Sequence, residues 1–554
     1  MTSAKSVVFN YYRYFTNGNE FITPKKSIRK FMETPTLKHQ GHPPALFILF
    51  FTEMWERFSY YGMRALLVLF LVSSVLGDKL GHNPGWGWER AEALQLYAVY
   101  TGLVYLTPII GGWIADNFLG YRKSVILGAF IMTLGHACMA LDTPFFFYTG
   151  LVCIIAGNGL FKPNISSIVG QLYTHDSDKK DSAYTIFYMG INAGSFLGIL
   201  LCGYIGEKVG WSWGFGLAGI FMFLGMLQFT FAQKIFGSIG LSPKKEVALS
   251  AIDPHANPVT EEIVEESHQA KKVSRDRIFV IVVFSIFTIF FWMAFEQAGG
   301  SMTIFAKDYT NRVLEGSSAT IFKWVNSSIV VGAMIILCIV LFNLFKQTFK
   351  KYALSNSILA SSFLIIWAIV IWKLNREFRE DITEVPASWF SILNSFFIIT
   401  LAPLFSKIWE SKFNPSGPIK FGIGLILLGL GFAILAYGGL PIAQGAKTAS
   451  VSMVWLILAY LFHTMGELCV SPVGLSYISK LSPVKIVGLM FGIWFVATFI
   501  ANTLAGLTGS LIDGITSKYS ISIFFMIFSV IPIVAGLVLF GLNKSLKKKM
   551  HGIH

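Results

Sequence analysis

The fold of this chain is decided by EMWERFSYYGMR, residues 53–64. This stretch lies within an apolar run from about residue 45 to residue 76, and a helix needs only about 20 residues to cross a bilayer. Two acids and two arginines at that depth cost about 2.5–3.5 kcal/mol each on insertion scales, so we expect their side chains to face protein or water. Five polar residues share one helix face at 100° per residue, namely Glu53, Glu56, Arg57, Tyr60 and Arg64. The stripe is therefore expected to point into a helix bundle, either as a functional site or as an internal salt bridge that locks helices together.

Composition places the chain among helical membrane proteins. Of its 554 residues, 54% are apolar and only 13% are charged, whereas a soluble domain has about 25% charged residues. The net charge is +14, but the basic residues that produce it are scattered through short loops. The charge therefore does not indicate nucleic-acid binding. Residues 1–40 are polar and basic without an apolar core, and we expect no signal peptide. The five cysteines lie in apolar runs without metal-ligand spacing and are expected to be small core residues: Cys138, Cys153, Cys202, Cys338 and Cys469.

The apolar spans predict fourteen transmembrane helices. The spans lie near 45–76, 91–114, 123–141, 145–173, 183–206, 212–236, 278–306, 319–345, 353–373, 387–406, 419–438, 451–479, 486–512 and 520–543. With the N-terminus in the cytoplasm, the inside loops and the C-terminal tail hold about twice as many Lys and Arg residues as the outside loops. The positive-inside rule then places both termini in the cytoplasm.

The longest polar segment between spans, about 237–277, follows the first six helices and is typical of a linker between two bundles. We therefore expect a cytoplasmic N-terminal segment, a six-helix bundle, a cytoplasmic linker, a second six-helix bundle with an inserted helix pair, and a cytoplasmic tail. The boundaries are 1–44, 45–236, 237–277, 278–543 (inserted pair 319–373) and 544–554. Two such bundles suggest alternating access around a site near the bilayer midplane, although hydropathy alone leaves a channel or a receptor open.

A first family signal is GGWIADNFLGYRK, residues 111–123. It resembles the signature that the major facilitator superfamily carries between its second and third helices. Its acid and basic residues can pair in one transport state and separate in another. A plain structural turn is the competing interpretation.

Four further motifs are more specific: residues 53–64, GNGLFKPN at 157–164, FYMGINAGS at 187–195 and GELCVSPVGLS at 466–476. Together they resemble the proton-dependent oligopeptide transporter family, in the family's order and over most of residues 45–543. The resemblance implies an all-α major facilitator fold and a symporter, not an enzyme, that imports di- and tripeptides with protons as the coupling ion and without another cofactor.

The resemblance also implies roles for individual residues. The proton-coupling residues would be Glu53, Glu56, Arg57, Lys162 and Glu296. The substrate-binding residues would be Arg57, Tyr60, Tyr61, Arg64, Tyr100, Lys162, Asn192, Trp292, Glu296, Asn394, Glu467, Ser471 and Trp494. In this set, the basic side chains would meet the peptide carboxylate and Glu467 the peptide amino group.

The chain departs from the family pattern in two places. Many bacterial members carry an extra helix pair in the linker between the bundles, whereas here the pair at 319–373 lies within the second bundle. An even number of inserted helices preserves the orientation of the later ones. In addition, Ser395 follows Asn394 where the family pattern leads us to expect proline.

The charged residues of the two bundles also fit a peptide-binding site when the family resemblance is left aside. A small peptide holds its carboxylate and ammonium roughly 7–11 Å apart when extended. The first bundle supplies Arg57, Arg64 and Lys162, and the second supplies Glu296 and Glu467. A ligand that bridges these opposed charges would favour closure of the two bundles, and aromatic walls would accept many side chains.

Other functions remain open at this stage. Nitrate or a modified amino acid could be the substrate, although an anion-only site does not need Glu467. A drug antiporter would favour an acidic cavity over three basic residues, and a peptide-binding sensor would need a signalling module that the linker does not show. We expect a multi-pass protein of the cytoplasmic (inner) membrane that contacts the lipid bilayer, peptide substrates and no nucleic acid, and that functions as a monomer.

Overall fold

The computed structural model describes residues 41–77, 83–173, 177–241, 268–483 and 486–553. Contacts divide the chain into residues 1–42 and 43–554, and the fold below is that of the second unit. The predicted linker falls largely on residues 242–267, which lie outside the described residues.

Fourteen α-helices of 19 or more residues run through the described residues, as the apolar spans predict. They are α3 (Pro44–Val72), α4 (Arg90–Ile114), α5 (Tyr121–Met139), α6 (Pro144–Gln171), α7 (Ser177–Lys208), α8 (Trp211–Phe231), α10 (His268–Phe295), α12 (Gly316–Thr348), α13 (Ala353–Arg379), α14 (Ile392–Glu410), α15 (Gly417–Gly438), α16 (Val454–Leu481), α17 (Val487–Gly509) and α19 (Ile521–Lys549). Within the part of the chain that the structure describes, twelve helical segments are long and apolar enough to cross a membrane. The remaining long helices are α5 and α3, and α3 carries the charged stripe.

Short elements complete the fold. The helices α11 (Ser301–Asp308) and α18 (Ile512–Lys518) precede loops. The 3₁₀ helix η4 (Glu296–Gly299) lies between α10 and α11, and the 3₁₀ helix η5 (Ala387–Ser391) leads into α14. Strand β1 (Thr310–Asn311) pairs in parallel with β4 (Val451–Ser452), and β2 (Val313–Leu314) pairs antiparallel with β3 (Thr383–Glu384).

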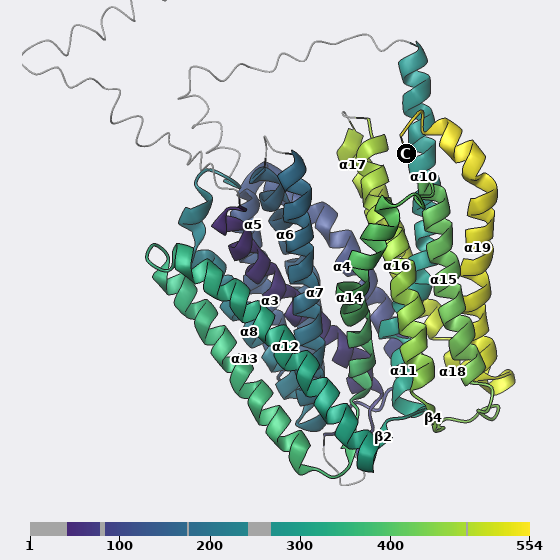
Figure 1. Ribbon diagram of the computed structural model, residues 1–554. Coiled ribbons are helices and arrows are strands. Elements are labelled where there is room, and N and C mark those ends of the chain that lie inside the picture. The colour runs from purple at the N-terminus through teal and green to yellow at the C-terminus, as the bar shows by residue number, and fades with distance from the viewer. Residues whose placement is uncertain (1–40, 78–82, 174–176, 242–267, 484–485, 554) are drawn as a thin grey trace, which may run out of the picture. The chain divides into compact units, whose positions relative to one another are not determined.

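The long helices form two halves, which Figure 1 shows on either side of the molecule. Helices α3 to α8 pack with one another and form the N-terminal half, while α10 and α14 to α19 form the C-terminal half. Several helices start with proline in the first turn, as α3 does at Pro44, because that position needs no backbone N–H. Close packing depends on small residues: a Cβ on Gly111 of α4 would collide with the backbone of Gly159 in α6.

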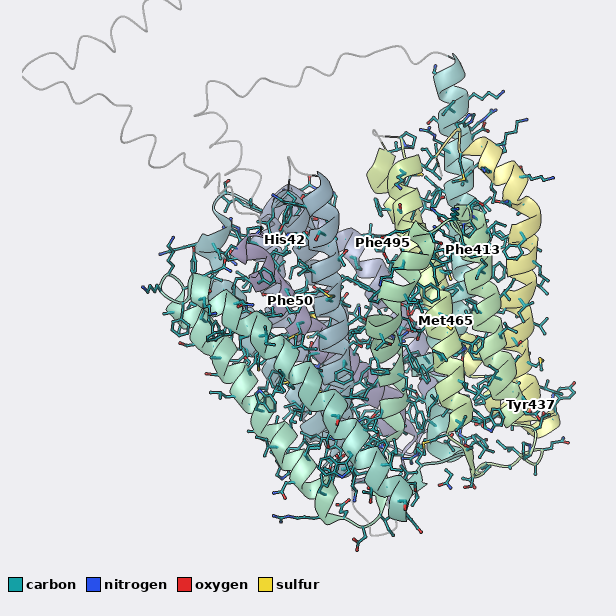
Figure 2. The ribbon with its side chains drawn as sticks, in the orientation of Figure 1. His42, Phe50, Phe413, Tyr437, Met465 and Phe495 are labelled. Carbon is teal, nitrogen blue, oxygen red and sulfur yellow. The ribbon has the colours of Figure 1, made fainter. Side chains whose placement is uncertain are left out.

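Apolar side chains lie both inside and outside the halves (Figure 2). Phe50 is only 4% exposed within the N-terminal half, whereas Tyr437 at the end of α15 is 64% exposed. Exposed aromatic residues at helix ends are typical of the membrane–water interface.

The inserted pair, α12 and α13, docks on the N-terminal half although it belongs by sequence to the C-terminal half (Figure 1). Phe363 of α13 packs edge-on against Phe51 and Trp55 of α3, with ring centroids 5.7 Å apart in each case. The Ser355 hydroxyl donates to the Gln228 carbonyl of α8 at 2.8 Å. The pair therefore has one face on the N-terminal half, and other residues, such as Ile336, are exposed.

The two halves meet through ion pairs at the end where α3 and α7 end and α4 begins, here called the closed end. Arg90 of α4 contacts Asp308 at 2.7 Å and Asp513 at 2.9 Å. Lys208 of α7 contacts Glu384 of β3 at 2.5 Å. Burial alone would raise the pKa of Glu384, but the neighbouring Arg312 and Lys208 hold it below its ordinary value. The closed end is thus held by charged pairs across the halves.

Candidate functional site

The charged stripe of α3 forms a buried network inside the N-terminal half. Glu53, Glu56 and Arg57 are at most 3% exposed. Arg57 Nε lies 3.0 Å from Glu53 Oε1, one helical turn earlier, and Arg57 also pairs with Glu56. Asn158 of α6 donates from Nδ2 to Glu56 Oε1 at 3.1 Å. The structure therefore brings three of the predicted proton-coupling residues together.

The network is not fully satisfied. Among the described residues, Glu53 Oε2 and Arg57 Nη2 are buried without a hydrogen-bond partner. A buried ion that lacks partners is costly, and a change in protonation or a new ligand can relieve that cost. The network is thus suited to exchange a proton or an anion.

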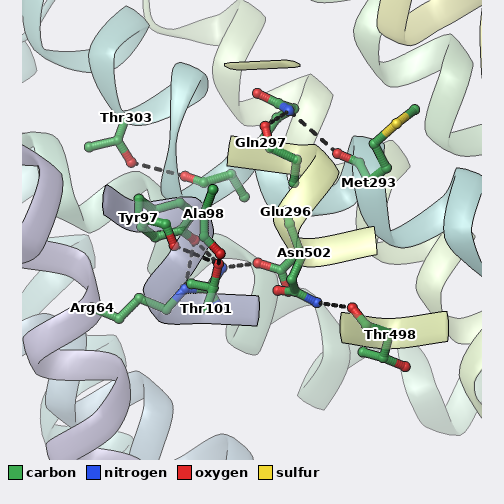
Figure 3. A network of polar contacts seen from close by, with 12 residues as sticks. Arg64, Tyr97, Ala98, Thr101, Met293, Glu296, Gln297, Thr303, Thr498 and Asn502 are labelled. Atoms are coloured by element: carbon green, nitrogen blue, oxygen red, sulfur yellow. Dashed lines mark hydrogen bonds and ion pairs between the residues drawn. The ribbon is translucent and has the colours of Figure 1, made fainter. Parts of the chain in front are cut away.

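A second charged cluster joins the two halves (Figure 3). Arg64 of α3 donates from Nε to the Tyr97 hydroxyl of α4 at 2.8 Å and pairs with Glu296 of η4. The side chains of Arg64 and Glu296 are 11% and 4% exposed. The predicted carboxylate-binding arginine and the predicted proton site of the second bundle are therefore direct partners.

A third cluster lies in the C-terminal half around Glu467 of α16. Asn394 of α14 donates from Nδ2 to Glu467 Oε2 at 2.8 Å and to Thr464 Oγ1 at 3.2 Å. Asn394 donates to only one of the two carboxylate oxygens of Glu467. Glu467 can therefore still accept hydrogen bonds from an ammonium group.

A cavity of about 120 Å³ lies between the second and third clusters. This volume is smaller than that of a typical small-molecule site, about 300–1,000 Å³. Six predicted substrate residues line it: Tyr61, Arg64, Trp292, Glu296, Asn394 and Glu467. The lining combines a cation from the N-terminal half, two carboxylates from the C-terminal half and aromatic rings.

The other predicted substrate residues lie outside this lining, namely Arg57, Tyr60, Tyr100, Lys162, Asn192, Ser471 and Trp494. Tyr60 and Tyr100 pack on each other, with ring centroids 6.4 Å apart and both hydroxyls buried without a partner among the described residues. Lys162 Nζ lies 4.3 Å from the ring centroid of Tyr105, which does line the cavity.

Arg57 belongs to the buried network of α3, and the other three residues lie within the helix packing in this conformation. Asn192 donates to the Tyr188 carbonyl of its own helix at 3.0 Å. A Cβ on Gly474 would collide with the ring of Trp494, so these two residues pack closely. The Ser471 hydroxyl is buried without a partner among the described residues.

Among the contact residues that were not predicted from the sequence, three hold or line parts of the site. Tyr105 lines the cavity in place of Tyr100, Tyr97 holds Arg64, and Asn158 holds Glu56. Asn158 belongs to the motif at 157–164 and could have been found there. The choice among the tyrosines of α4 depends on how the helix is rotated against its neighbours, which the sequence does not state.

Two helical halves with a charged cavity at their boundary are the architecture of a secondary transporter. The family model described as the POT family matches residues 122–360 and 360–530. The chain is 33% identical over 532 residues to an uncharacterized transporter, YclF, of Bacillus subtilis, covering 93% of this chain and 96% of the relative. It is 32% identical to a di-/tripeptide transporter of Lactococcus lactis, covering 92% and 97% of the two chains. The protein belongs to the POT family.

Solved structures of the family share the fold. A crystal structure of a POT peptide transporter in complex with sulfate is 26% identical, with a TM-score of 0.68 over 93% of this chain and 97% of that chain. A POT family transporter in complex with 5-aminolevulinic acid is also 26% identical, with a TM-score of 0.69 over 92% and 97%. The major facilitator fold implied by the sequence motifs is thereby confirmed.

Proposed function

We propose that the protein imports di- and tripeptides together with protons by alternating access. The observation that carries this proposal is the cavity at the boundary of the halves. Its walls present Arg64 from one half and Glu296 and Glu467 from the other, which is the charge arrangement that a zwitterionic peptide requires. The names of the relatives, di-/tripeptide transporters among them, support the same substrate class.

Coupling follows from competition for the buried cations. Arg64 is now held by Glu296, and a peptide carboxylate that binds Arg64 displaces that acid. A buried carboxylate that loses its cation is stabilised by binding a proton. The same exchange applies to Glu53 and Glu56 around Arg57. Peptide binding and proton binding thereby support each other.

The driving force is sufficient for accumulation. One charge that moves through 100 mV is worth about 2.3 kcal/mol. At about 1.4 kcal/mol per tenfold change, this free energy supports roughly a fortyfold concentration gradient. A single coupled proton is therefore enough to concentrate a peptide.

Orientation follows from the distribution of Lys and Arg among the loops. We place both termini in the cytoplasm of a protein of the cytoplasmic (inner) membrane, so the closed end faces outside. The proposal includes function as a monomer in the lipid bilayer, protons as the coupling ion, no further cofactor and no enzymatic step.

The proposal is tested by uptake of labelled dialanine into proteoliposomes, with and without an inward proton gradient. We expect accumulation above equilibrium only with the gradient, and competition by unlabelled tripeptide. Gradient-driven uptake of nitrate or of a modified amino acid without uptake of dialanine would contradict the proposed substrate class.

The polarity of the site gives a prediction about Glu467. Glu467→Gln keeps the shape of the side chain but removes a charge-assisted hydrogen bond to the peptide ammonium, and such bonds contribute about 1.5–3 kcal/mol. We expect the affinity for dialanine to fall about tenfold or more, measured by competition against labelled dialanine. N-acetylated dialanine lacks the ammonium, so its weak binding is expected to stay the same. Equal losses for both ligands would show that Glu467 has a structural role only.

A further inference from the structure

Lys373 of the inserted pair is a buried cation that the transport site does not use. Its side chain is completely buried, and Nζ lies 2.8 Å from Glu377 Oε2, one turn later in α13. The ammonium also lies 4.6 Å from the ring centroid of Trp389 and 5.4 Å from that of Tyr204. Both distances fall within the range of cation–π interactions.

The two rings belong to different halves. Tyr204 lies in α7 of the N-terminal half, and Trp389 lies in η5, which leads into α14 of the C-terminal half. Their ring centroids are 6.1 Å apart. Lys373 therefore contacts one ring from each half, while the rest of α13 docks on α3 and α8 through Phe363 and Ser355.

Direct contacts also hold η5 against α7. The Glu207 carboxylate accepts hydrogen bonds from the backbone N–H groups of Ala387 at 2.8 Å and Ser388 at 2.9 Å. Trp389 Nε1 donates to the Leu200 carbonyl at 3.1 Å. A Cβ on Gly203 would collide with the Ser388 hydroxyl, so the approach requires glycine there. These contacts form a seam between the halves at the closed end.

Opening of the closed end requires this seam to separate. If η5 moves away from α7, the Lys373 ammonium keeps at most one of its two rings while it stays paired with Glu377. The cation–π contact to the ring that moves away is then lost. Lys373 thus stabilises the closed conformation relative to the open one.

We infer that Lys373 is a positioning residue of the transport cycle, through which the inserted helix pair holds η5 on α7 and favours the state closed at this end. The inference rests on the proposed function in one respect: the proposed orientation makes the closed end the outside end of the transporter. It assigns the inserted pair a role in the balance between the two conformations.

A local role is the competing explanation, because Lys373 and Glu377 also form an i,i+4 pair within one helix. A local pair would affect the thermal stability of α13 but not the balance between open and closed states. The two explanations therefore differ in the accessibility of the cavity from outside.

The test uses Lys373→Met combined with Glu377→Gln, which removes both charges and leaves no unpaired ion. Ala65, which lines the cavity, is changed to cysteine in a full-length chain whose five native cysteines are replaced by alanine. In right-side-out vesicles, we expect labelling of Ala65→Cys by a membrane-impermeant maleimide to be about fivefold faster or more than in the parent. The apparent KM for external dialanine is expected to fall, since a larger fraction of molecules is open to the outside.

The matched control is Arg376→Met. Arg376 lies in the same helix, is 40% exposed, and its ion pair is with Glu380 of the adjoining turn. We expect parental labelling for this variant. An unchanged labelling rate in the double variant, or an equal increase in Arg376→Met, would overturn the inference.

A second variant covers the case in which the double variant does not reach the membrane. Trp389→Leu removes the ring of the C-terminal half and leaves the Lys373–Glu377 pair in place. Labelling is expected to rise in this variant as well, and parental labelling would again overturn the inference. Maleimide labelling does not depend on peptide transport, so failure of dialanine uptake in the parent would refute the proposed function and leave this test valid.

Discussion

Glu56→Gln is expected to abolish gradient-driven uptake of dialanine while leaving a folded protein in the membrane. Glu56 is completely buried, pairs with Arg57 and accepts a hydrogen bond from Asn158. Glutamine has nearly the same shape and can still accept from Asn158, but it cannot take up or release a proton. Arg57 keeps Glu53 at 3.0 Å as its counter-ion, so folding does not depend on Glu56 alone.

Two uptake modes separate coupling from binding in this variant. Gradient-driven uptake needs net proton movement and is expected to fall to the level of empty liposomes. Counterflow exchanges labelled for unlabelled dialanine without net proton movement and is expected to persist. Glu410→Gln is the control, because Glu410 lies exposed at the end of α14 and accepts from Ser406. Normal gradient-driven uptake by Glu56→Gln would refute the coupling role.

The second large effect concerns the pair that joins the halves. Arg64→Met leaves Glu296 buried without its cation, and loss of one partner of a buried ion pair costs about 3–5 kcal/mol. We expect a marked fall in the thermal unfolding midpoint of the purified protein and loss of gradient-driven uptake. Arg64→Met combined with Glu296→Gln removes both charges, so the unfolding midpoint is expected to recover while uptake stays absent.

The double variant makes this prediction specific. Because Arg64 and Glu296 contact each other directly, their effects on stability should be strongly non-additive. Tyr97→Phe removes one hydrogen bond to Arg64 and is expected to lower the unfolding midpoint only slightly. Additive losses in the double variant would mean that the pair does not form in the protein.

The helices could be predicted from the sequence because each apolar span is long enough to cross a bilayer and is bounded by polar loops. The inserted pair was also found in this way, since its spans at 319–345 and 353–373 correspond to α12 and α13. The buried stripe of α3 followed from the cost of charge in an apolar segment. These features depend on local sequence alone.

Contacts between distant segments could not be predicted. Arg64 and Glu296 are separated by 232 positions, and their pairing depends on how the two halves face each other. Tyr105 lines the cavity, whereas Tyr100 was predicted to do so, because the rotation of α4 about its axis decides which tyrosine faces the cavity. Hydropathy likewise does not show that α13 docks on the N-terminal half or that Lys373 lies between Tyr204 and Trp389.

The central claim, that peptide and proton enter together, is tested most directly by proton flux. Proteoliposomes are loaded with a pH-sensitive dye, no pH gradient is imposed, a negative interior potential is set, and dialanine is added outside. The account predicts acidification of the interior that starts with dialanine, saturates with its concentration and is absent in Glu56→Gln. Entry of labelled dialanine without acidification would contradict it.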